Sequence, residues 1–188
     1  MSKIGIEIKD LRLSFASTVA LSISNIILDA INPTIILGSN GAGKSLFLRL
    51  LHGLSKPDRG SIEFPEVYRS NYSQAMVFQR PVLLRRSALA NVTFAMQARG
   101  ISKVHAVRCA KIWMERAELG HLEGSPARRL SGGEQQKLAI ARAIYFNRKC
   151  IVIDEGLNAM DNKNQIMILN LLKVLKSHKY SIVIVSHE

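Results

Sequence analysis

Long hydrophobic runs are absent from this chain: none approaches the roughly 18 residues that a membrane-spanning helix needs. Any contact with a membrane would therefore come through a partner protein. Cysteine is scarce as well, because Cys109 and Cys150 lie far apart and form no CxxC pair, and a reducing compartment is the simple inference. Internal repeats and low-complexity linkers are also absent, and the alternating residues 1–9 predict a strand and not a signal peptide. The 188 residues, 47% of them hydrophobic, predict one compact cytoplasmic domain.

Acidic residues are few, with 14 against 26 basic ones, which gives a formal net charge of +12. Such a charge can indicate a nucleic-acid partner. The basic residues are scattered, however, as pairs such as Arg85-Arg86 and Arg128-Arg129, without the aromatic interleaving of single-strand binders. A positive surface near anionic lipid headgroups explains the charge as well. We rank that interpretation higher and expect no nucleic-acid partner.

What the chain does have is a full phosphate-binding loop at residues 38–45, Gly-Ser-Asn-Gly-Ala-Gly-Lys-Ser. Its glycines let consecutive N–H groups approach phosphate oxygens, and the apolar residues on either side predict the strand and helix that this motif requires. Lys44 is expected to reach the β- and γ-phosphates, and the Ser45 hydroxyl to bind Mg²⁺. The candidate nucleotide-binding residues here are Gly38, Ser39, Asn40, Gly41, Ala42, Gly43, Lys44, Ser45 and Leu46.

A second element is the apolar run 150–153, which is followed by Asp154 and Glu155. It predicts a buried parallel strand that delivers two carboxylates at its carboxyl end, where open α/β sheets place their ligands. Asp154 is expected to hold Mg²⁺ through water, and Glu155 to orient and polarise the water that attacks the γ-phosphorus. A strand that merely ends in acidic surface residues is the alternative, which the complete loop upstream disfavours.

A second glycine motif, Leu-Ser-Gly-Gly-Glu-Gln at residues 130–135, precedes a helical stretch at 134–146. Ser131, Gly132 and Gly133 make another helix N-terminus whose N–H groups can meet an anion. With these three motifs the chain resembles the nucleotide-binding subunits of ATP-binding cassette (ABC) transporters. The resemblance implies that Ser131 and Gly133 of one subunit close over the ATP in the P-loop of a second subunit. The active state would then be a head-to-tail dimer with two sandwiched ATP molecules.

The resemblance also assigns roles to further positions. Gln79 matches the glutamine that touches Mg²⁺ and the attacking water, and His187 matches the switch histidine that contacts the γ-phosphate. Asp161 matches the aspartate that communicates across the dimer. Phe15 resembles the aromatic residue that stacks on adenine, although a phenylalanine in an apolar strand is more often part of the core.

The fold that the resemblance implies is α/β: a P-loop NTPase with a RecA-like mixed sheet core, a small N-terminal antiparallel β part and an inserted helical subdomain. Residues 1–188 would form a single nucleotide-binding domain with the helical subdomain at about 82–130. The chain ends at Glu188, whereas family members usually continue with further strands and a helix, and a natural short form and a fragment both remain open. If the strand expected at 181–185 were uncovered, it would present unpaired backbone groups.

Apolar spacing predicts helices at 91–99, at 103–118 with Ser102 as N-cap, and at 163–177. Burial within the helical subdomain is expected for Trp113. The apolar positions at helical spacing are Val104, Val107, Met114 and Ala117 in the second helix and Ile166, Leu169, Leu172 and Leu175 in the third.

The implied function is that of an ATP-hydrolysing subunit that works with MgATP at the cytoplasmic face of the cell membrane. Its partners would be a second copy of the chain, separate permease subunits and, indirectly, an external solute-binding protein. Residues 51–54 and 78–92 resemble importer subunits for oxyanions such as tungstate or molybdate, although the solute is selected elsewhere. Two alternatives remain: a soluble ABC ATPase that acts on ribosomes or nucleic acid, which the charge favours, and a nucleotide-binding scaffold without useful turnover, which the retention of Lys44, Glu155 and His187 disfavours.

Overall fold

The computed structural model describes residues 5–66, 74–144, 150–154, 162–177 and 180–186. Its first sheet is antiparallel and has β1 at its centre. The strands of this sheet are β1 (Gly5–Phe15), β2 (Thr18–Ile23), β3 (Ile26–Asp29) and β5 (Arg59–Glu63). In β1 the buried positions change from Ile6 and Ile8 to Leu11 and Leu13 across Asp10, which has a positive φ of 43°. This irregularity keeps the apolar side chains of both halves of the strand on the inner face.

The second sheet is parallel and runs in the order β4-β8-β7-β6. Its strands are β4 (Thr34–Leu37), β6 (Gln74–Val77), β7 (Cys150–Asp154) and β8 (Ser181–Ser186). Every residue of β7 and β8 is buried, as expected for parallel strands with both faces covered. The concern that strand 181–185 would form an open edge was wrong, because β4 and β7 pair with its two sides.

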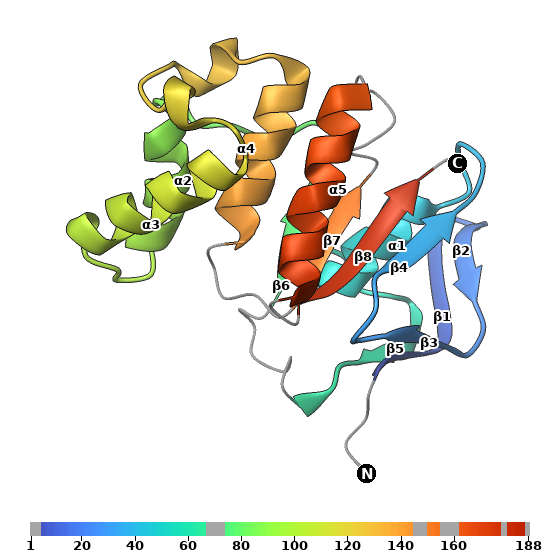
Figure 1. Cartoon of the computed structure of the whole chain (residues 1–188). Coiled ribbons are helices and arrows are strands. Elements are labelled where there is room, and N and C mark those ends of the chain that lie inside the picture. The colour runs from blue at the N-terminus through green and yellow to red at the C-terminus, as the bar shows by residue number, and fades with distance from the viewer. Residues whose placement is uncertain (1–4, 67–73, 145–149, 155–161, 178–179, 187–188) are drawn as a thin grey trace.

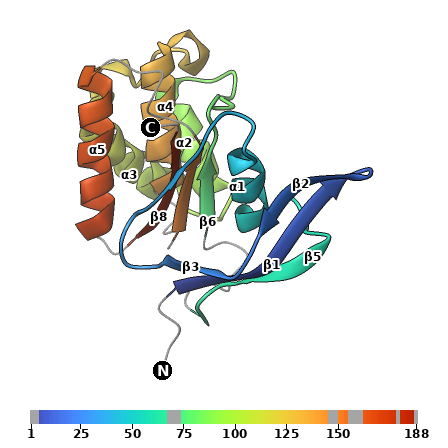
Figure 2. The same cartoon turned by 90° about the vertical axis from the view of Figure 1, so that its right-hand side faces the viewer.

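Helices cover both faces of the parallel sheet (Figures 1 and 2). Helix α1 (Lys44–His52) lies between the two sheets, and α4 (Gly132–Ile144) and α5 (Asn162–Ser177) lie on the opposite face of the parallel sheet. One apolar core therefore fills the space around α1, and a second lies beneath α4 and α5. In the described part of the chain, no helix is both long and apolar enough to cross a bilayer.

A helical segment lies beyond α4 (Figure 1) and packs around a third core. It consists of α2 (Ala88–Gln97), α3 (Lys103–Arg116) and the 3₁₀ turns η2 (Gly120–Leu122) and η3 (Ala127–Arg129). Ser87 caps α2, and Ser102 caps α3 as the sequence predicted. Trp113 is half-buried between the third core and the core beneath α4 and α5, and the Arg116 guanidinium lies 4.6 Å from the centre of its ring.

The faces that two helices bury overlap only in part with the predicted ones, since Met114, Ala117, Leu172 and Leu175 are buried as expected. In α3 the buried side chains are Ala106, Ala110 and Met114, whereas Val104 is 82% exposed. In α5 Ile166 and Leu169 are also largely exposed. The residues that α5 buries are Ile168, Leu171, Leu172 and Leu175. Both helices carry apolar residues on more than one face, so helical spacing alone selected some positions of the buried face together with exposed ones.

Candidate nucleotide-binding site

The phosphate-binding loop joins β4 to α1, in the strand-loop-helix order that the motif requires. Gly41 and Gly43 have φ values of 80° and 82°, which residues with a side chain rarely adopt. A Cβ atom on Gly43 would also lie 3.0 Å from the side chain of Leu21 in the neighbouring sheet. The loop backbone turns back on itself, with the Ala42 amide donating to the Ser39 carbonyl at 3.2 Å.

Lys44, the first residue of α1, directs its side chain back into this loop. Its side chain is only 7% exposed, and Nζ donates to the carbonyl oxygens of Gly38 at 2.6 Å and Ser39 at 2.8 Å. Among the described residues, no side chain caps α1 and no acidic residue lies in its first turn. Backbone N–H groups and a lysine ammonium are therefore directed at one small region, which suits a phosphate.

Two of the three predicted metal ligands, Ser45 and Asp154, meet although 109 positions separate them. Ser45 Oγ donates to Asp154 Oδ1 at 2.9 Å, and Asp154 is buried at the carboxyl end of β7. A hydroxyl and a carboxylate at this distance are oxygen ligands of the kind that Mg²⁺ takes beside a nucleotide phosphate. The donor set therefore fits the magnesium ion that the sequence predicts.

Gln79 lies two residues beyond β6, and the register pairs Val77 at the end of β6 with Ile153 of β7. Its side chain is exposed at the edge of the sheet where Asp154 also ends its strand. Leu46, the last predicted residue of the loop, packs instead against the core around α1. Asn40 lies in the exposed turn of the loop.

Phe15 is 59% exposed at the end of β1. The alternative that it belongs to the core is therefore wrong, and the aromatic ring remains accessible to a flat ligand. Glu155, Asp161 and His187 lie outside the described residues.

Ser131 precedes α4, which begins at Gly132, and Gly133 follows within the first turn. The amide and the hydroxyl of Ser131 both donate to Glu134 Oε2, at 2.7 and 2.8 Å, and the Glu134 amide donates to Ser131 Oγ at 3.3 Å. These hydrogen bonds lower the pKa of the Glu134 carboxyl below its ordinary value. The sequence shows this Ser-x-x-Glu capping box, but its role in the site had not been predicted.

Three polar side chains that the sequence did not single out fix the segment between Gln79 and α2. Asn91 is fully buried and bonds to Leu84 through both backbone groups, at 2.8 and 3.2 Å. Arg128, close to Ser131, donates to the Leu83 carbonyl at 2.9 Å. Arg142 of α4 donates to the Val82 carbonyl at 2.9 Å. The chain that follows Gln79 is therefore tied to the chain that precedes Ser131.

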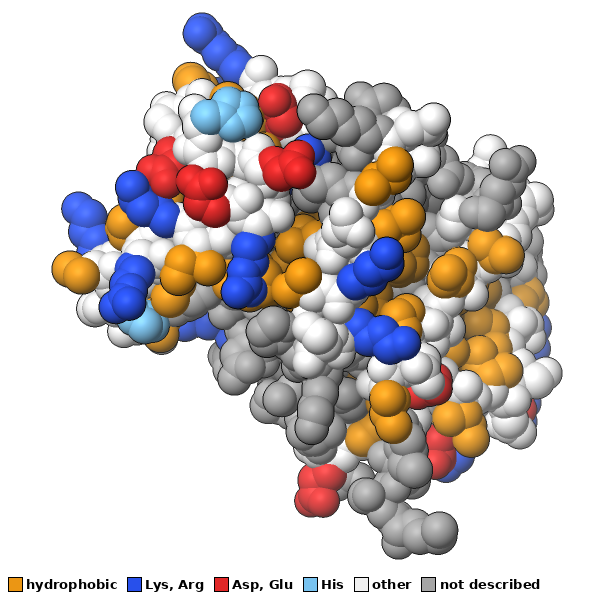
Figure 3. Space-filling model, viewed as in Figure 1, with side chains coloured by type: hydrophobic (Ala, Val, Ile, Leu, Met, Phe, Trp, Pro, Cys, Tyr) orange, Lys and Arg blue, Asp and Glu red, His pale blue; other side chains and the backbone are white. Residues whose placement is uncertain are grey.

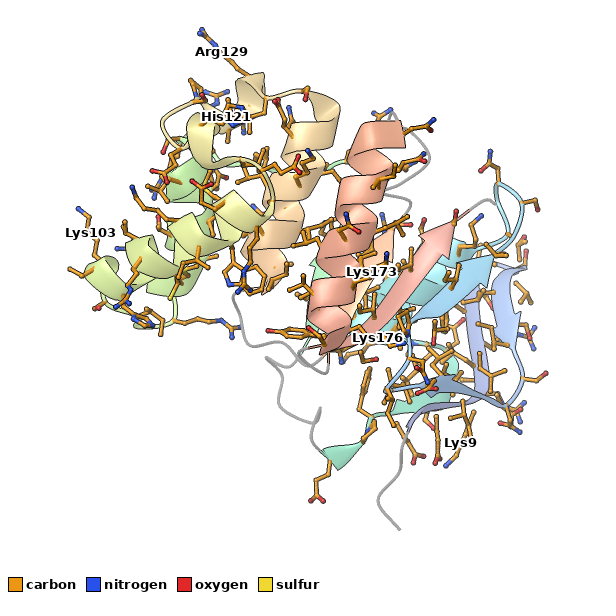
Figure 4. The ribbon with its side chains drawn as sticks, viewed as in Figure 1. Lys9, Lys103, His121, Arg129, Lys173 and Lys176 are labelled. Carbon is orange, nitrogen blue, oxygen red and sulfur yellow. The ribbon has the colours of Figure 1, made fainter. Side chains whose placement is uncertain are left out.

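The basic residues are distributed over several elements. On the face shown in Figure 3, Lys and Arg side chains stand in separate groups with apolar and uncharged side chains between them. Figure 4 shows Lys103, His121 and Arg129 on the helical segment, Lys173 and Lys176 on α5, and Lys9 on the first sheet. This face carries no continuous basic stripe along its described residues of the kind that follows a nucleic-acid backbone.

Several known proteins are similar to this chain. The methionine import ATP-binding protein MetN of Francisella tularensis subsp. tularensis (strain SCHU S4 / Schu 4) is 34% identical, and the match covers 97% of this chain and 57% of MetN. The tungstate uptake system ATP-binding protein TupC of Peptoclostridium acidaminophilum is 29% identical over 161 residues, 81% of this chain and 74% of TupC. The lipoprotein-releasing system ATP-binding protein LolD of Coxiella burnetii (strain RSA 493 / Nine Mile phase I) is 36% identical over 166 residues, 81% of this chain and 71% of LolD.

Solved structures give the same result for the fold. The structure of cbiO1 from Clostridium perfringens, part of the ABC transporter complex cbiONQ, has a TM-score of 0.85 and 26% identity, and the match covers 100% of this chain and 80% of that one. The ADP conformation of MJ1267, an ATP-binding cassette of an ABC transporter, has a TM-score of 0.83 and 26% identity over 99% of this chain and 82% of that one. The expected P-loop NTPase architecture is thus confirmed.

A family model described as ABC transporter matches residues 22–158, which include the phosphate-binding loop, Ser131 and Asp154. The chain spans just over half the length of MetN, and about three quarters of TupC. The sequence match, the fold and the site agree, and the chain therefore belongs to the ABC transporter family.

Proposed function

We propose that this chain binds and hydrolyses MgATP as the nucleotide-binding subunit of an ABC transporter. The observation that carries the proposal is the 2.9 Å hydrogen bond between Ser45 and Asp154, which joins the phosphate-binding loop to the end of β7. Lys44, held within 2.8 Å of two loop carbonyls, supplies a positive charge at the same place. The relatives whose names contain "ATP-binding protein" support the choice of nucleotide.

The residues of the site divide into those that bind the nucleotide and those that act on the attacking water. The loop amides and Lys44 bind and orient the phosphates, and Phe15 offers a face to the adenine. Bound magnesium would be held by Ser45 and Asp154 and would neutralise charge on the phosphates. Glu155, the next residue after Asp154, accepts the proton of the attacking water. Gln79 orients that water, and His187 donates a hydrogen bond to the γ-phosphate.

The complete site needs two copies of the chain. Ser131, Gly132 and Gly133 close over the nucleotide in the partner's loop, and Asp161 communicates across the contact. Permease subunits and an external solute-binding protein complete the importer, with this chain at the cytoplasmic face of the membrane. The solved cbiO1, part of the complex cbiONQ, supports an assembly with other subunits.

The solute is a narrower proposal. An oxyanion such as tungstate is the first candidate, which the TupC relative supports at 29% identity. MetN at 34% identity makes methionine the second. Stimulation of ATP hydrolysis by each loaded binding protein, in vesicles that contain the cognate permease, distinguishes the two solutes.

Hydrolysis and light scattering test the proposed ATPase together. The wild-type chain should hydrolyse ATP only with Mg²⁺ present. Glu155→Gln should still bind ATP, lose nearly all turnover because an amide cannot accept the proton, and shift from monomer to dimer when MgATP is added. Glu66→Gln changes an exposed carboxylate elsewhere and should leave both properties unchanged. Near-normal turnover in Glu155→Gln would remove Glu155 from its role.

A further inference from the structure

Ser131 already binds the carboxylate of Glu134 in its own chain. Both of its donors, the backbone amide and the hydroxyl, end on the same oxygen of Glu134, Oε2, at 2.7 and 2.8 Å. Ser131 is exposed and Glu134 is half-buried, so this contact lies at the surface of the subunit. In the proposed two-subunit site, the same serine must meet the phosphate of a nucleotide bound by the partner.

We propose that Glu134 is a positioning residue that opposes closure of the dimer: its carboxylate occupies the Ser131 donors in the open subunit and must leave them before the partner's phosphate can bind. This inference rests on the proposed function, because it presupposes that Ser131 faces the partner's nucleotide. It means that closure costs each subunit the hydrogen bonds between Ser131 and Glu134, and that the contact with the partner's phosphate must offset this loss.

Charge acts in the same direction as the hydrogen bonds. The two bonds from Ser131 lower the pKa of Glu134, so the group stays ionised through the neutral range. The positive charges that act on Glu134 are those of Lys137, one turn further along α4, and His121, and Lys137 Nζ also lies 3.9 Å from Glu118 Oε2. A carboxylate held at Ser131 therefore repels an incoming phosphate as well as competing with it for donors.

The contact also stabilises the open subunit, because it forms a capping box at the start of α4. Loss of the carboxylate should thus lower the melting temperature of the subunit without nucleotide while it makes closure easier. These opposite signs separate the proposal from a purely structural role, in which a weakened α4 would impair folding and closure together.

The test uses the full chain in the Glu155→Gln background, with MgATP titrated and the dimer followed by light scattering. Glu134→Ala removes both acceptor and charge, and should lower the MgATP concentration for half-maximal dimer by about fivefold, the size expected for one net hydrogen bond. Glu134→Gln retains an acceptor for Ser131 without the charge, and should fall between the parent and Glu134→Ala. Glu115→Gln, on the exposed side of α3, is the matched control and should not shift the midpoint.

The possible outcomes are distinct. An unchanged or raised midpoint in Glu134→Ala, with a parent that dimerises, overturns the role of Glu134 and leaves the two-subunit site standing. A parent that binds ATP but never dimerises overturns the two-subunit site, and the proposal with it. A lowered midpoint together with a lowered melting temperature without nucleotide supports the proposal.

Discussion

Lys44 is buried within its own loop because two carbonyl oxygens, of Gly38 and Ser39, accept hydrogen bonds from its ammonium group. At the scale of single residues, this geometry orients the side chain before any ligand arrives. A preorganised charge costs little reorganisation during the reaction, which is why such groups contribute strongly to phosphoryl transfer.

Lys44→Ala should therefore lower the rate of ATP hydrolysis by about 100-fold or more, since a positioned charge on the transferring phosphate is lost. Lys173→Ala, which removes an exposed lysine of α5 (Figure 4), is the control and should hydrolyse ATP at the normal rate. Steady-state phosphate release measures both. A normal rate in Lys44→Ala would exclude this lysine from the reaction.

The two cysteines should react very differently with a thiol reagent at pH 8. Burial raises the pKa of Cys150 to about 12 from an ordinary 9.0, so its thiol stays protonated when folded, whereas Cys109 is only partly buried. Cys109 should therefore be labelled quickly, and Cys150 only after denaturant is added. Because the folded pKa is raised, this group's contribution to stability is full below about pH 9 and is lost as the pH rises toward 12. Rapid labelling of Cys150 in the folded chain would contradict its burial in β7.

At the scale of secondary-structure elements, one buried amide determines the path of the chain between Gln79 and α2. Asn91 donates to three carbonyl oxygens and accepts from one amide, and these four bonds connect it to Leu84, Arg86 and Ser87. Such a segment has no regular hydrogen bonding of its own, so the side chain replaces it.

Asn91→Ala should destabilise the protein by about 2–4 kcal/mol, because several buried backbone groups lose their partner. Asn170→Ala, at an exposed position of α5, is the matched control and should change stability by less than about 0.5 kcal/mol. Denaturant unfolding followed by circular dichroism compares the two. Equal stabilities would show that the amide does not hold the segment.

Helix α5 offers a comparison within one residue type. Ile168→Ala should cost about 2–5 kcal/mol because this side chain is fully buried, whereas Ile166→Ala, at 60% exposure, should cost less than about 1 kcal/mol. The same unfolding experiment measures both variants. The reverse order would restore the stripe through Ile166 that helical spacing had predicted.

In α5, apolar periodicity predicts the extent of the helix but only part of the face that it buries. The helix at 163–177 was predicted within one residue, because the amount of apolar sequence is high and Gly or Pro do not interrupt it. Which of its faces is buried depends on where the sheet lies, and that is a long-range property. The neighbours of β8 could not be predicted either, since the order of strands in a parallel sheet depends on long-range packing and not on a local sequence pattern.

At the scale of the whole molecule, the fold brings together residues that are remote in sequence. The meeting of Ser45 with Asp154 was predictable, because both belong to motifs whose combination is specific. The hydrogen bonds of Arg128 and Arg142 to the segment after Gln79 could not be predicted, because an arginine in a basic sequence is usually expected to be a solvated surface residue. The capping box of Ser131 and Glu134 is local and visible in the sequence, but its position opposite the proposed second nucleotide is a property of the assembly.

Mixing two inactive variants tests most directly whether two copies share each nucleotide site. Lys44→Ala has a defective loop and an intact Ser131, whereas Ser131→Ala has an intact loop and lacks the hydroxyl that meets the partner's phosphate. Each should be inactive alone, and a one-to-one mixture should recover about one quarter of the wild-type hydrolysis rate, since half of the dimers formed by chance carry one complete site. A mixture as inactive as its components, made from chains that fold and exchange subunits, would contradict a site built from two subunits.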